Sequence, residues 1–289
     1  MRIADQWTEY EVYDCSDGEK LERFGDYVLR RPDPQVIWKT PKGREWEKVN
    51  AVYHRSSKGG GEWEFIDLPD EWSICYKALT FRLKPFRFKH TGVFPEQAVN
   101  WELASSLIRG ARRPVKVLNL FAYTGGATLA CAAAGAKVTH VDAAKGMVAW
   151  AKENAEVSGL KEAPVRWLVD DCARFVAREL RRGNTYDAVI MDPPSYGRGP
   201  KGEIWKLEDC LYPLVMDTVK LLSDEPLFFL INSYTTGLNP GVLTYLLSHA
   251  LKRYGGEAVS DEIGLPVKRS GLVLPCGSSG WWTNKRDMI

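Results

Sequence analysis

The residues best suited to chemistry form the segment Asp192-Pro193-Pro194-Ser195-Tyr196, which follows a short apolar run. Each proline fixes its own backbone and restricts the residue before it, so the two prolines hold the turn extended and rigid. Acceptors from Asp192, Pro193 and Pro194 beside the ring of Tyr196 would form a slot for a planar base, with the acceptors at its polar edge and the ring on its face. The alternative is a loop that its prolines merely stiffen.

A second candidate loop ends in two glycines, Gly125 and Gly126, at the start of a helix of small residues. Adjacent glycines allow a ligand to approach the backbone closely. The loop lacks the GxGxxG pattern, which leaves a pyrophosphate site poorly supported, and it lacks the GK[ST] sequence, which excludes a P-loop. A helix start that requires tight packing is the alternative interpretation.

Acidic residues follow the next two predicted strands. Asp142 ends the second strand, where a carboxylate can accept from both hydroxyls of a ribose. Enzymes that use nicotinamide dinucleotides and enzymes that use S-adenosylmethionine both place an acid there. Asp170 and Asp171 follow the third strand, where a carboxylate can accept from an adenine amino group. Each of these residues could instead be a helix N-cap, although three acid-bearing loops in sequence order are harder to explain as caps alone.

A regular alternation of apolar strands and helical segments, beginning near residue 95, positions these loops. Pro95 and Gly110 mark the ends of the first helix, and Asn239-Pro240 caps and opens the last. This alternation predicts a mostly parallel sheet with helices on both faces, and ligands bind such sheets at the carboxyl ends of the strands. The predicted strands cover residues 115–120, 137–141, 165–169, 188–191, 227–231, 257–263 and 271–275, and the predicted helices cover 95–110, 126–134, 145–158, 173–182, 206–222 and 239–254.

The first 84 residues differ in pattern. Apolar side chains alternate along residues 72–76 and 79–83, a period of two that is typical of half-buried strands. We expect two domains: a small antiparallel β domain over residues 1–84, and an α/β domain over residues 85–289 whose first part, 85–114, is a basic linker and helix. Five of the eleven tryptophans lie in the first 80 residues, where they either fill a thin core or contact planar ligands.

Composition narrows the class of protein. The 289-residue chain is 45% hydrophobic and carries a formal net charge of +2, which argues against wrapping nucleic acid by bulk charge. It has no run of about 18 uncharged apolar residues and no layout of a secretory signal, so we expect neither a membrane span nor export. None of the six cysteines forms a CxxC pair and none of the four histidines clusters with cysteine. We therefore expect a reduced, cytoplasmic protein without a metal site.

The charge is unevenly distributed. Residues 1–80 contain 12 basic and 16 acidic residues, whereas residues 81–116 contain 8 and 2. In the segment 81–90, Phe-Arg-Leu-Lys-Pro-Phe-Arg-Phe-Lys-His, basic residues are interleaved with aromatic ones, which suits phosphate contact combined with base stacking. Lys89 in this segment and Arg198 near the Asp-Pro-Pro loop are the candidate substrate-binding residues. An edge strand with solvated charges is the alternative.

Together these motifs resemble a known family. The loop 119–126, Asp142, Asp171 and Asp192-Pro-Pro stand in the order and spacing of a class I S-adenosylmethionine-dependent methyltransferase, and the resemblance covers about residues 95–289. More narrowly, the chain resembles the ribosomal-RNA large-subunit methyltransferase group that joins a small β domain to this fold, on the segments 23–30, 90–97 and 192–199. The resemblance implies a Rossmann-like, doubly wound, seven-stranded sheet, with S-adenosyl-L-methionine as cofactor and RNA, ribosomal RNA favoured, as substrate.

The resemblance also assigns roles by position. The backbone from Ala122 to Gly125 would hold the methionine end of the cofactor, Asp142 its ribose and Asp171 its adenine amino group, while Asp192 to Tyr196 would frame the target base as the catalytic edge. The full set assigned to the cofactor is Phe94, Gln97, Asn119, Phe121, Ala122, Tyr123, Thr124, Gly125, Asp142, Ala143, Asp171 and Asp192.

Two departures bear on the target atom. Family members that methylate carbon 5 of cytosine carry a catalytic cysteine after the fifth strand, because the ring must be activated by thiolate addition. Here the segment 231–237 has none, and Cys276 could approach the site only if the last strands fold back over it. Amino-methylating enzymes place an aromatic directly after the second proline, where this chain has Ser195. We therefore prefer transfer to a ring or exocyclic nitrogen, mainly by positioning.

Other functions remain open at this point. A methyltransferase acting on a protein or a small molecule uses the same cofactor loops. A NAD-dependent oxidoreductase would explain Asp142. It would not explain the Asp-Pro-Pro loop, and the chain lacks the GxGxxG pattern that such an enzyme needs. A non-catalytic RNA-binding protein that retains the pocket is a further alternative.

Overall fold

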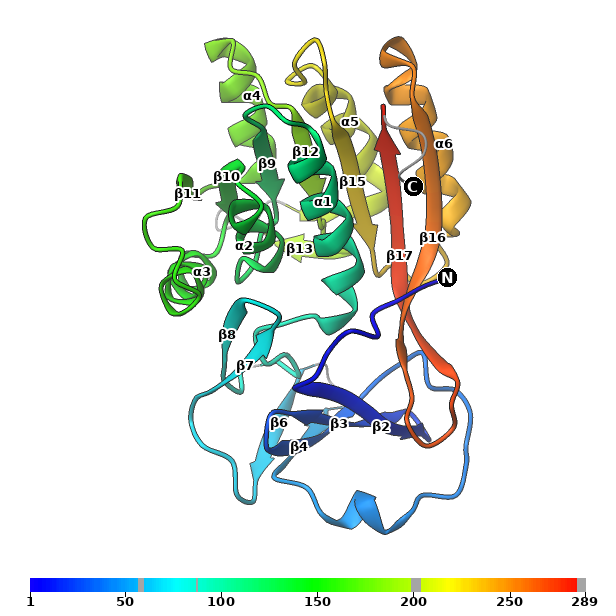
Figure 1. Ribbon diagram of the computed structural model, residues 1–289. Helices are drawn as coiled ribbons and strands as arrows, with labels where there is room; N and C mark the ends of the chain where they lie inside the picture. The colour runs from blue at the N-terminus through cyan, green and yellow to red at the C-terminus, as the bar shows by residue number, and fades with distance from the viewer. Residues whose placement is uncertain (57–59, 87, 199–203, 285–289) are drawn as a thin grey trace. The chain divides into compact units, whose positions relative to one another are not determined.

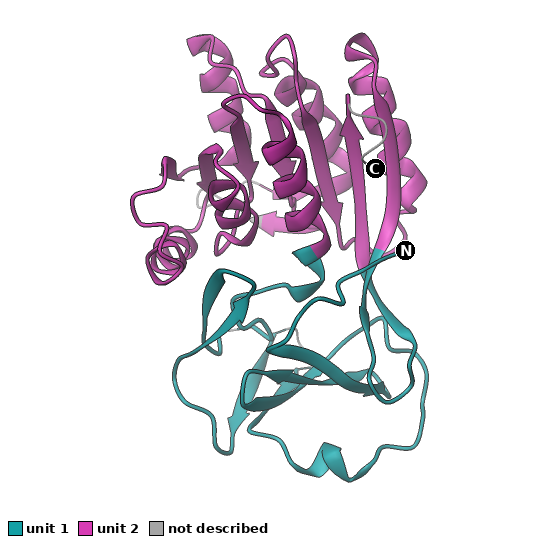
Figure 2. Ribbon diagram, in the orientation of Figure 1, with its two compact units in different colours: residues 1–98, 263–276 teal, residues 99–262, 277–289 magenta. Residues whose placement is uncertain are grey.

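The computed structural model describes residues 1–56, 60–86, 88–198 and 204–284. The chain divides into two compact units whose extents differ from the predicted domains (Figure 2). The first unit contains Met1–Ala98 and also Ile263–Cys276, and the second contains Val99–Glu262 and Gly277–Ile289. The first unit thus continues beyond residue 84 and takes in a segment from late in the sequence.

The α/β part of the chain is built on a mostly parallel sheet of eight strands (Figure 1). In sheet order the strands are β1 (Arg2–Ile3), β16 (Glu257–Pro266), β17 (Val273–Thr283), β15 (Phe228–Ser233), β12 (Ala188–Met191), β9 (Lys116–Leu120), β10 (Lys137–Asp142) and β11 (Val165–Val169). The consecutive pairs from β11 to β15 are parallel, and β17 is antiparallel to β15. This confirms the predicted sheet of seven strands, to which the two-residue β1 adds an eighth beside β16.

Alternate side chains of the central strands fill two separate hydrophobic cores. Val189 and Met191 of β12 belong to one core, with residues of α4, α5 and α6, whereas Ala188 and Ile190 belong to the other, with residues of α1 and α2. Because both faces of β12 are covered, its sequence, Ala-Val-Ile-Met, is an unbroken apolar run. The helices are α1 (Ala98–Gly110), α2 (Gly126–Ala133), α3 (Lys145–Val157), α4 (Cys172–Arg182), α5 (Leu207–Val219) and α6 (Pro240–Ala250).

The helix ends follow the chemistry expected from the sequence. Pro95 opens the short 3-10 helix η2 (Pro95–Gln97) that leads into α1. Asn239 caps α6 by accepting from the amide of Gly241 at 2.9 Å, and Gly183 ends α4 with a φ of 68°. Across the described ranges, none of the helices combines the length and the apolar character that crossing a membrane requires.

The last strand is longer than predicted. Residues 277–280, Gly-Ser-Ser-Gly, have the composition of a turn, yet β17 continues through them to Thr283. A Cβ at Gly280 would lie 2.7 Å from the Cβ of Leu243, so the glycine lets α6 pack directly on the strand. Trp281 and Trp282 follow, both buried, one in each core. The prediction ended this strand too early because the glycines serve packing rather than a turn.

A five-stranded sheet and a separate hairpin form the first unit. The sheet, in order, contains β2 (Tyr10–Ser16), β3 (Glu19–Phe24), β4 (Tyr27–Pro32), β5 (Ala51–Arg55) and β6 (Gly61–Phe65), and the hairpin contains β7 (Trp72–Tyr76) and β8 (Leu79–Leu83). The predicted strands 72–76 and 79–83 are confirmed, and Ile74 and Phe81 are fully buried. Neighbouring strands are antiparallel except β4 and β5, which are parallel. A long connection containing the 3-10 helix η1 (Arg44–Glu47) makes that parallel pair possible.

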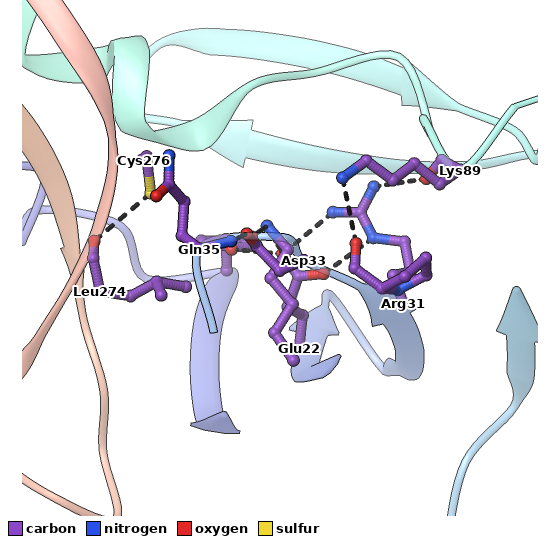
Figure 3. A network of polar contacts seen from close by, with 10 residues as sticks. Glu22, Arg31, Asp33, Gln35, Lys89, Leu274 and Cys276 are labelled. Atoms are coloured by element: carbon purple, nitrogen blue, oxygen red, sulfur yellow. Dashed lines mark hydrogen bonds and ion pairs between the residues drawn. The ribbon is translucent and has the colours of Figure 1, made fainter. Parts of the chain in front are cut away.

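Charged side chains, rather than apolar ones alone, fill part of the first unit's interior (Figure 3). The Glu22 carboxylate accepts from Arg31 through Nε at 2.8 Å and Nη2 at 2.9 Å, and from the Tyr10 hydroxyl at 2.6 Å. The ammonium of Lys20 lies 3.2 Å from Glu22 and 3.4 Å from Asp33. The two buried carboxylates are thus matched by two cations, and the network joins β3 to β4.

Burial by itself raises the pKa of Glu22, because it penalises the charged carboxylate. The charges of Arg31 and Lys20, together with hydrogen bonds from Arg31 and Tyr10, outweigh that effect and lower the pKa to about 2. The carboxylate is therefore ionised at neutral pH.

We expect Glu22→Gln to destabilise the protein by about 3–5 kcal/mol at pH 7, because it leaves two buried cations, Arg31 and Lys20, with only the Asp33 carboxylate between them. The pKa of Glu22 is lower in the folded state than the usual 4.5, so its contribution is present above pH 4.5 and decreases as the pH falls towards 2. The difference between wild type and variant in denaturant titrations should therefore shrink in acid. Glu64→Gln, which affects an exposed contact with His54, is the control and should change stability by less than about 1 kcal/mol. A pH-independent difference would contradict this account.

Candidate active site

The candidate loops follow neighbouring parallel strands. β10, β9 and β12 lie side by side and run in the same direction, so the segments 121–125, 143–144 and 192–196 leave the sheet at one edge (Figure 1). Backbone contacts join them there. The amide of Ala122 donates to the carbonyl of Val141 at 3.1 Å, and the amide of Asp192 donates to the carbonyl of Leu120 at 3.3 Å. The sheet thus brings the predicted cofactor loop and the Asp-Pro-Pro loop to the same edge.

The loop after β9 has an unusual backbone. Phe121 and Tyr123 have positive φ angles of 56° and 49°, and Gly125 has a φ of 90°. Non-glycine residues in this region cost free energy and persist only where neighbouring contacts impose them. Two such contacts are present: the amide of Phe121 donates to Sγ of Cys172 at 3.3 Å, and the amide of Tyr123 donates to Oδ2 of Asp142 at 2.9 Å.

Glycine is required at positions 125 and 126 for different reasons. Gly125 occupies a left-handed turn that other residues rarely adopt. A Cβ at Gly126 would lie 2.5 Å from the ring of Trp101, so this glycine lets α1 approach the start of α2. The packing interpretation of the glycine pair therefore holds for Gly126, while Gly125 shapes the loop.

Asp142 joins the loops after β9 and β10. Its Oδ2 accepts from the amide of Tyr123 and its Oδ1 accepts from the amide of Ala144 at 2.8 Å. Burial raises the pKa of this carboxyl, and the two amide bonds lower it, with a net increase. α3 begins after Ala144, whose own side chain provides no cap, so Asp142 organises the loop rather than the first turn of the helix. Each carboxylate oxygen keeps acceptor capacity beyond these bonds.

The two acids after β11 are used differently. Asp171 caps α4 by accepting from the amide of Arg174 at 2.9 Å through Oδ1. Asp170 forms an ion pair with Arg178. The cap that we weighed for Asp171 is thus present, and it engages one of its two oxygens.

Three other residues predicted for the cofactor lie in or next to the loops after β9 and β10. The amide of Asn119 donates to the hydroxyl of Thr128 at 2.9 Å in the interior, so its side chain serves packing. The carbonyl of the buried Thr124 accepts from the Asn154 amide at 2.9 Å. Ala143 is exposed next to Asp142.

The Asp-Pro-Pro loop is held by residues that sequence reasoning missed. The indole of Trp205 donates to the Pro194 carbonyl at 2.6 Å, and its ring lies 5.2 Å from that of Phe121. Trp205 belongs to a short hairpin, β13 (Tyr196–Arg198) with β14 (Ile204–Lys206). β14 precedes α5 directly; the predicted helix began at its last residue, Lys206, and no strand was predicted there. Its β-branched and aromatic residues are the signal that could have identified a strand.

The hairpin and its neighbours leave the Tyr196 ring 51% exposed, on the loop that the prolines stiffen. The Ser195 hydroxyl bonds that of Thr235 at 2.7 Å, which fixes the loop to the segment after β15. Within the described residues, the Pro193 carbonyl accepts no hydrogen bond, whereas that of Pro194 is engaged by Trp205. The side chain of Arg198 lies outside the described part of the chain.

A known protein family matches this chain. Residues 27–209 match the family model described as S-adenosylmethionine-dependent methyltransferase, which is more than half of the sequence. The chain belongs to the S-adenosylmethionine-dependent methyltransferases. Its cofactor is S-adenosylmethionine, and the matched segment contains the loops after β9, β10, β11 and β12.

Relatives of this methyltransferase include curated enzymes and a solved structure. It is 31% identical, over 74% of its length, to the ribosomal RNA large subunit methyltransferase K/L of Shewanella frigidimarina. It is 26% identical, over 76% of its length, to the ribosomal RNA large subunit methyltransferase K of Neisseria meningitidis. The matched parts are 32% and 59% of those two proteins, so the chain spans only part of each. The crystal structure of a SAM-dependent methyltransferase from Agrobacterium tumefaciens is 37% identical, covers 98% of this chain and 93% of its own, and has a TM-score of 0.93.

The hydrogen-bond acceptors of this methyltransferase fit the ribose of the cofactor. A ribose diol requires two acceptors, and Asp142 presents a carboxylate whose orientation two amides already fix. Asp142 is half-buried, and the exposed Ala143 follows it. Metal ligands are not part of this arrangement: among the residues that the structure describes, no group of three or more His, Cys, Asp and Glu could hold an ion.

Three predicted residues of the methyltransferase lie in the first unit. Phe94 precedes η2, and its carbonyl accepts from the amide of the buried Gln97 at 3.1 Å. Lys89 donates from Nζ to the Pro32 carbonyl at 3.0 Å. Burial and the nearby charge of Lys20 lower the pKa of Lys89 to about 8.

We expect Asp142→Asn to weaken binding of S-adenosylhomocysteine by about 10- to 100-fold, because a hydrogen bond to a charged group is worth about 1.5–3 kcal/mol. Burial raises the pKa of Asp142 above its usual 3.8, and protonation removes an acceptor. The affinity of the wild type should therefore fall with decreasing pH earlier than for an ordinary carboxyl.

Isothermal titration calorimetry at several pH values measures both effects. Asp217→Asn on α5, which affects only an exposed pair with Lys220, is the matched control. Equal affinity of the D142N variant and the wild type would refute a role for Asp142 in holding the ribose.

Proposed function

We propose that this methyltransferase modifies a base of RNA, with ribosomal RNA as the favoured substrate, and that the methyl group goes to a nitrogen atom. The names of the curated relatives support the RNA substrate. The observation that carries the proposal is the edge formed by Asp192, the Pro193 carbonyl and the half-exposed ring of Tyr196, which follows β12 beside the cofactor loop. A planar base with polar edge atoms fits such an edge better than an aliphatic substrate does.

The chemistry of the proposed reaction requires little beyond positioning. Bound S-adenosylmethionine supplies a methyl group on a positively charged sulfur. Asp142 holds the ribose and so fixes the cofactor at the end of β10. The Pro193 carbonyl and the Asp192 carboxylate would accept from the base edge and keep the lone pair of its nitrogen directed at the methyl group, while Tyr196 would stack on the base. S-adenosylhomocysteine would be the leaving group, and the proton lost by the nitrogen would pass to the Asp192 carboxylate or to water. Correct placement of two reactants contributes several kcal/mol to such a transfer.

The cysteine chemistry of the protein supports a nitrogen target. Methylation at carbon 5 of cytosine requires a thiolate to add to the ring. β15 ends in the buried polar residues Asn232 and Ser233 rather than a cysteine. Burial raises the pKa of the Cys276 thiol well above its usual value, and its Sγ donates to the Leu274 carbonyl at 3.4 Å. Cys276 is therefore a protonated thiol, which is a poor nucleophile.

Transfer of tritium from labelled cofactor tests the proposed substrate. We expect label in ribosomal RNA extracted from a strain that lacks the enzyme, and we expect nuclease to release it. Nucleoside mass spectrometry of the product then identifies the methylated atom. Label only in protein or in small molecules would refute RNA as substrate, and 5-methylcytidine would refute the nitrogen target.

We expect Cys276→Ser to retain methyl transfer to RNA within about twofold of the wild type, because no step uses the thiolate. The measurement is the initial rate of tritium incorporation, normalised to protein that is folded by circular dichroism. The D192N variant is the contrasting case and should lose most activity. A folded C276S variant without activity would contradict the nitrogen mechanism.

A further inference from the structure

The first unit exposes aromatic rings that its core does not use. Phe65 on β6 is 59% exposed, Phe88 is 55% exposed and Phe86 is 38% exposed. Trp63 is half-buried on β6, two residues before Phe65, so both rings lie on the same face of the strand. We call Trp63, Phe65, Phe86 and Phe88 the aromatic surface. Several large rings exposed together mark an interaction site more often than an ordinary surface.

Hydrogen bonds fix this surface in place. The Nε1 of Trp63 donates to the carbonyls of Phe86 at 2.9 Å and of Phe88 at 3.2 Å, which attaches the segment after β8 to β6. The rings of Trp63 and Phe65 are stacked, with centroids 6.4 Å apart and an interplanar angle of 21°. The buried ring of Tyr53 supports Trp63 edge-on at 5.3 Å. The Trp63 ring and the backbone of Phe86 and Phe88 are thus positioned before any ligand binds, which lowers the entropic cost of binding.

Strand alternation separates the acidic residues of β6 from this surface. Glu62 and Glu64 lie on the opposite face to Trp63 and Phe65, and Glu64 contacts His54 there at 2.7 Å. Arg55, opposite Gly61, lies on the aromatic face. The sequence from Arg82 to Lys89 contains four basic residues and no acidic one. Lys84 is ion-paired with Glu71 and Lys89 donates to the Pro32 carbonyl, so Arg55 and the exposed Arg82 are the cations that we assign to phosphates.

We infer that the aromatic surface binds a single-stranded segment of the RNA substrate by stacking on its bases, with the phosphates near the basic residues. Proteins bind unpaired nucleotides through exposed aromatic rings beside cations, and this surface has the parallel pair Trp63 and Phe65 with Arg55 on the same face. A protein partner would not require parallel rings, and the segregation of Glu62 and Glu64 favours an anionic ligand. This inference rests on the proposed function and extends it to a second contact, in the first unit, separate in sequence from the Asp-Pro-Pro loop.

Fluorescence anisotropy with the full chain tests the inference. The probes are an unstructured 12-nucleotide RNA and a duplex of the same length, without cofactor. We expect Phe65→Ala and Phe88→Ala each to weaken binding of the single strand about tenfold, since loss of one stacked ring typically has an effect of this size. Binding of the duplex should change by less than twofold. Tyr245→Ala removes an aromatic ring that is 78% exposed on α6, and this matched control should bind as the wild type does.

Substitutions of different shape separate stacking from general apolar contact. F65Y and F88Y should bind the single strand within about twofold of the wild type, whereas F65L and F88L should bind as weakly as the alanine variants. Unchanged binding in the alanine variants, or equal binding by the leucine and tyrosine variants, would overturn the inference. So would a change in self-association of the variants without a change in RNA binding. A chain that stacks on single strands but transfers no methyl group to RNA would refute the proposed function and leave this inference standing.

Discussion

The carboxylate of Asp142 is the contact on which the geometry of the cofactor loops depends. It binds amides from two loops at once, and one of them belongs to Tyr123, a residue whose backbone is strained. Without an acceptor at that point the strained turn would lose its compensating bond. β12 lies on the other side of β9, and the amide of Asp192 donates to the carbonyl of Leu120, so the loop proposed to hold the base leaves the sheet beside the strand end from which the Asp142-bonded loop starts.

Sequence patterns located the α/β elements well because each has a local signature. Buried parallel strands are largely apolar, and Asn239 begins α6 and Gly183 ends α4 through local chemistry. The prediction ended the last strand too early, before residues 276–283, and it missed the strand at 204–206. At Gly280 the deciding contact is with Leu243, which is distant in sequence, and at Trp205 it is with Phe121 and Pro194. Contacts between distant residues leave no periodic trace in a single sequence.

The same limit applies to the candidate site. Asp142 and the Asp-Pro-Pro loop were identifiable because they follow strands, and strand ends converge in a parallel sheet. The parts that hold them in place were not identifiable. The bond from Trp205 to Pro194 and the contact of Ser195 with Thr235 arise only once the chain is folded. The sequence also could not show that Asp142 accepts hydrogen bonds from two loop amides in addition to its proposed role as ribose acceptor, because an aspartate suits both roles.

The course of β17 has a consequence for how the protein is made. The strand begins in the first unit, with Val273–Cys276, and ends in the second, where Trp281 and Trp282 fill the two cores. A ribosome therefore releases most of the first unit's residues early, yet that unit lacks its last segment until residue 276 has emerged. Domains usually fold in the order in which they are synthesised. Here neither unit can be completed before the final strand, so synthesis delivers both at nearly the same moment, and cutting the chain once cannot yield either unit whole.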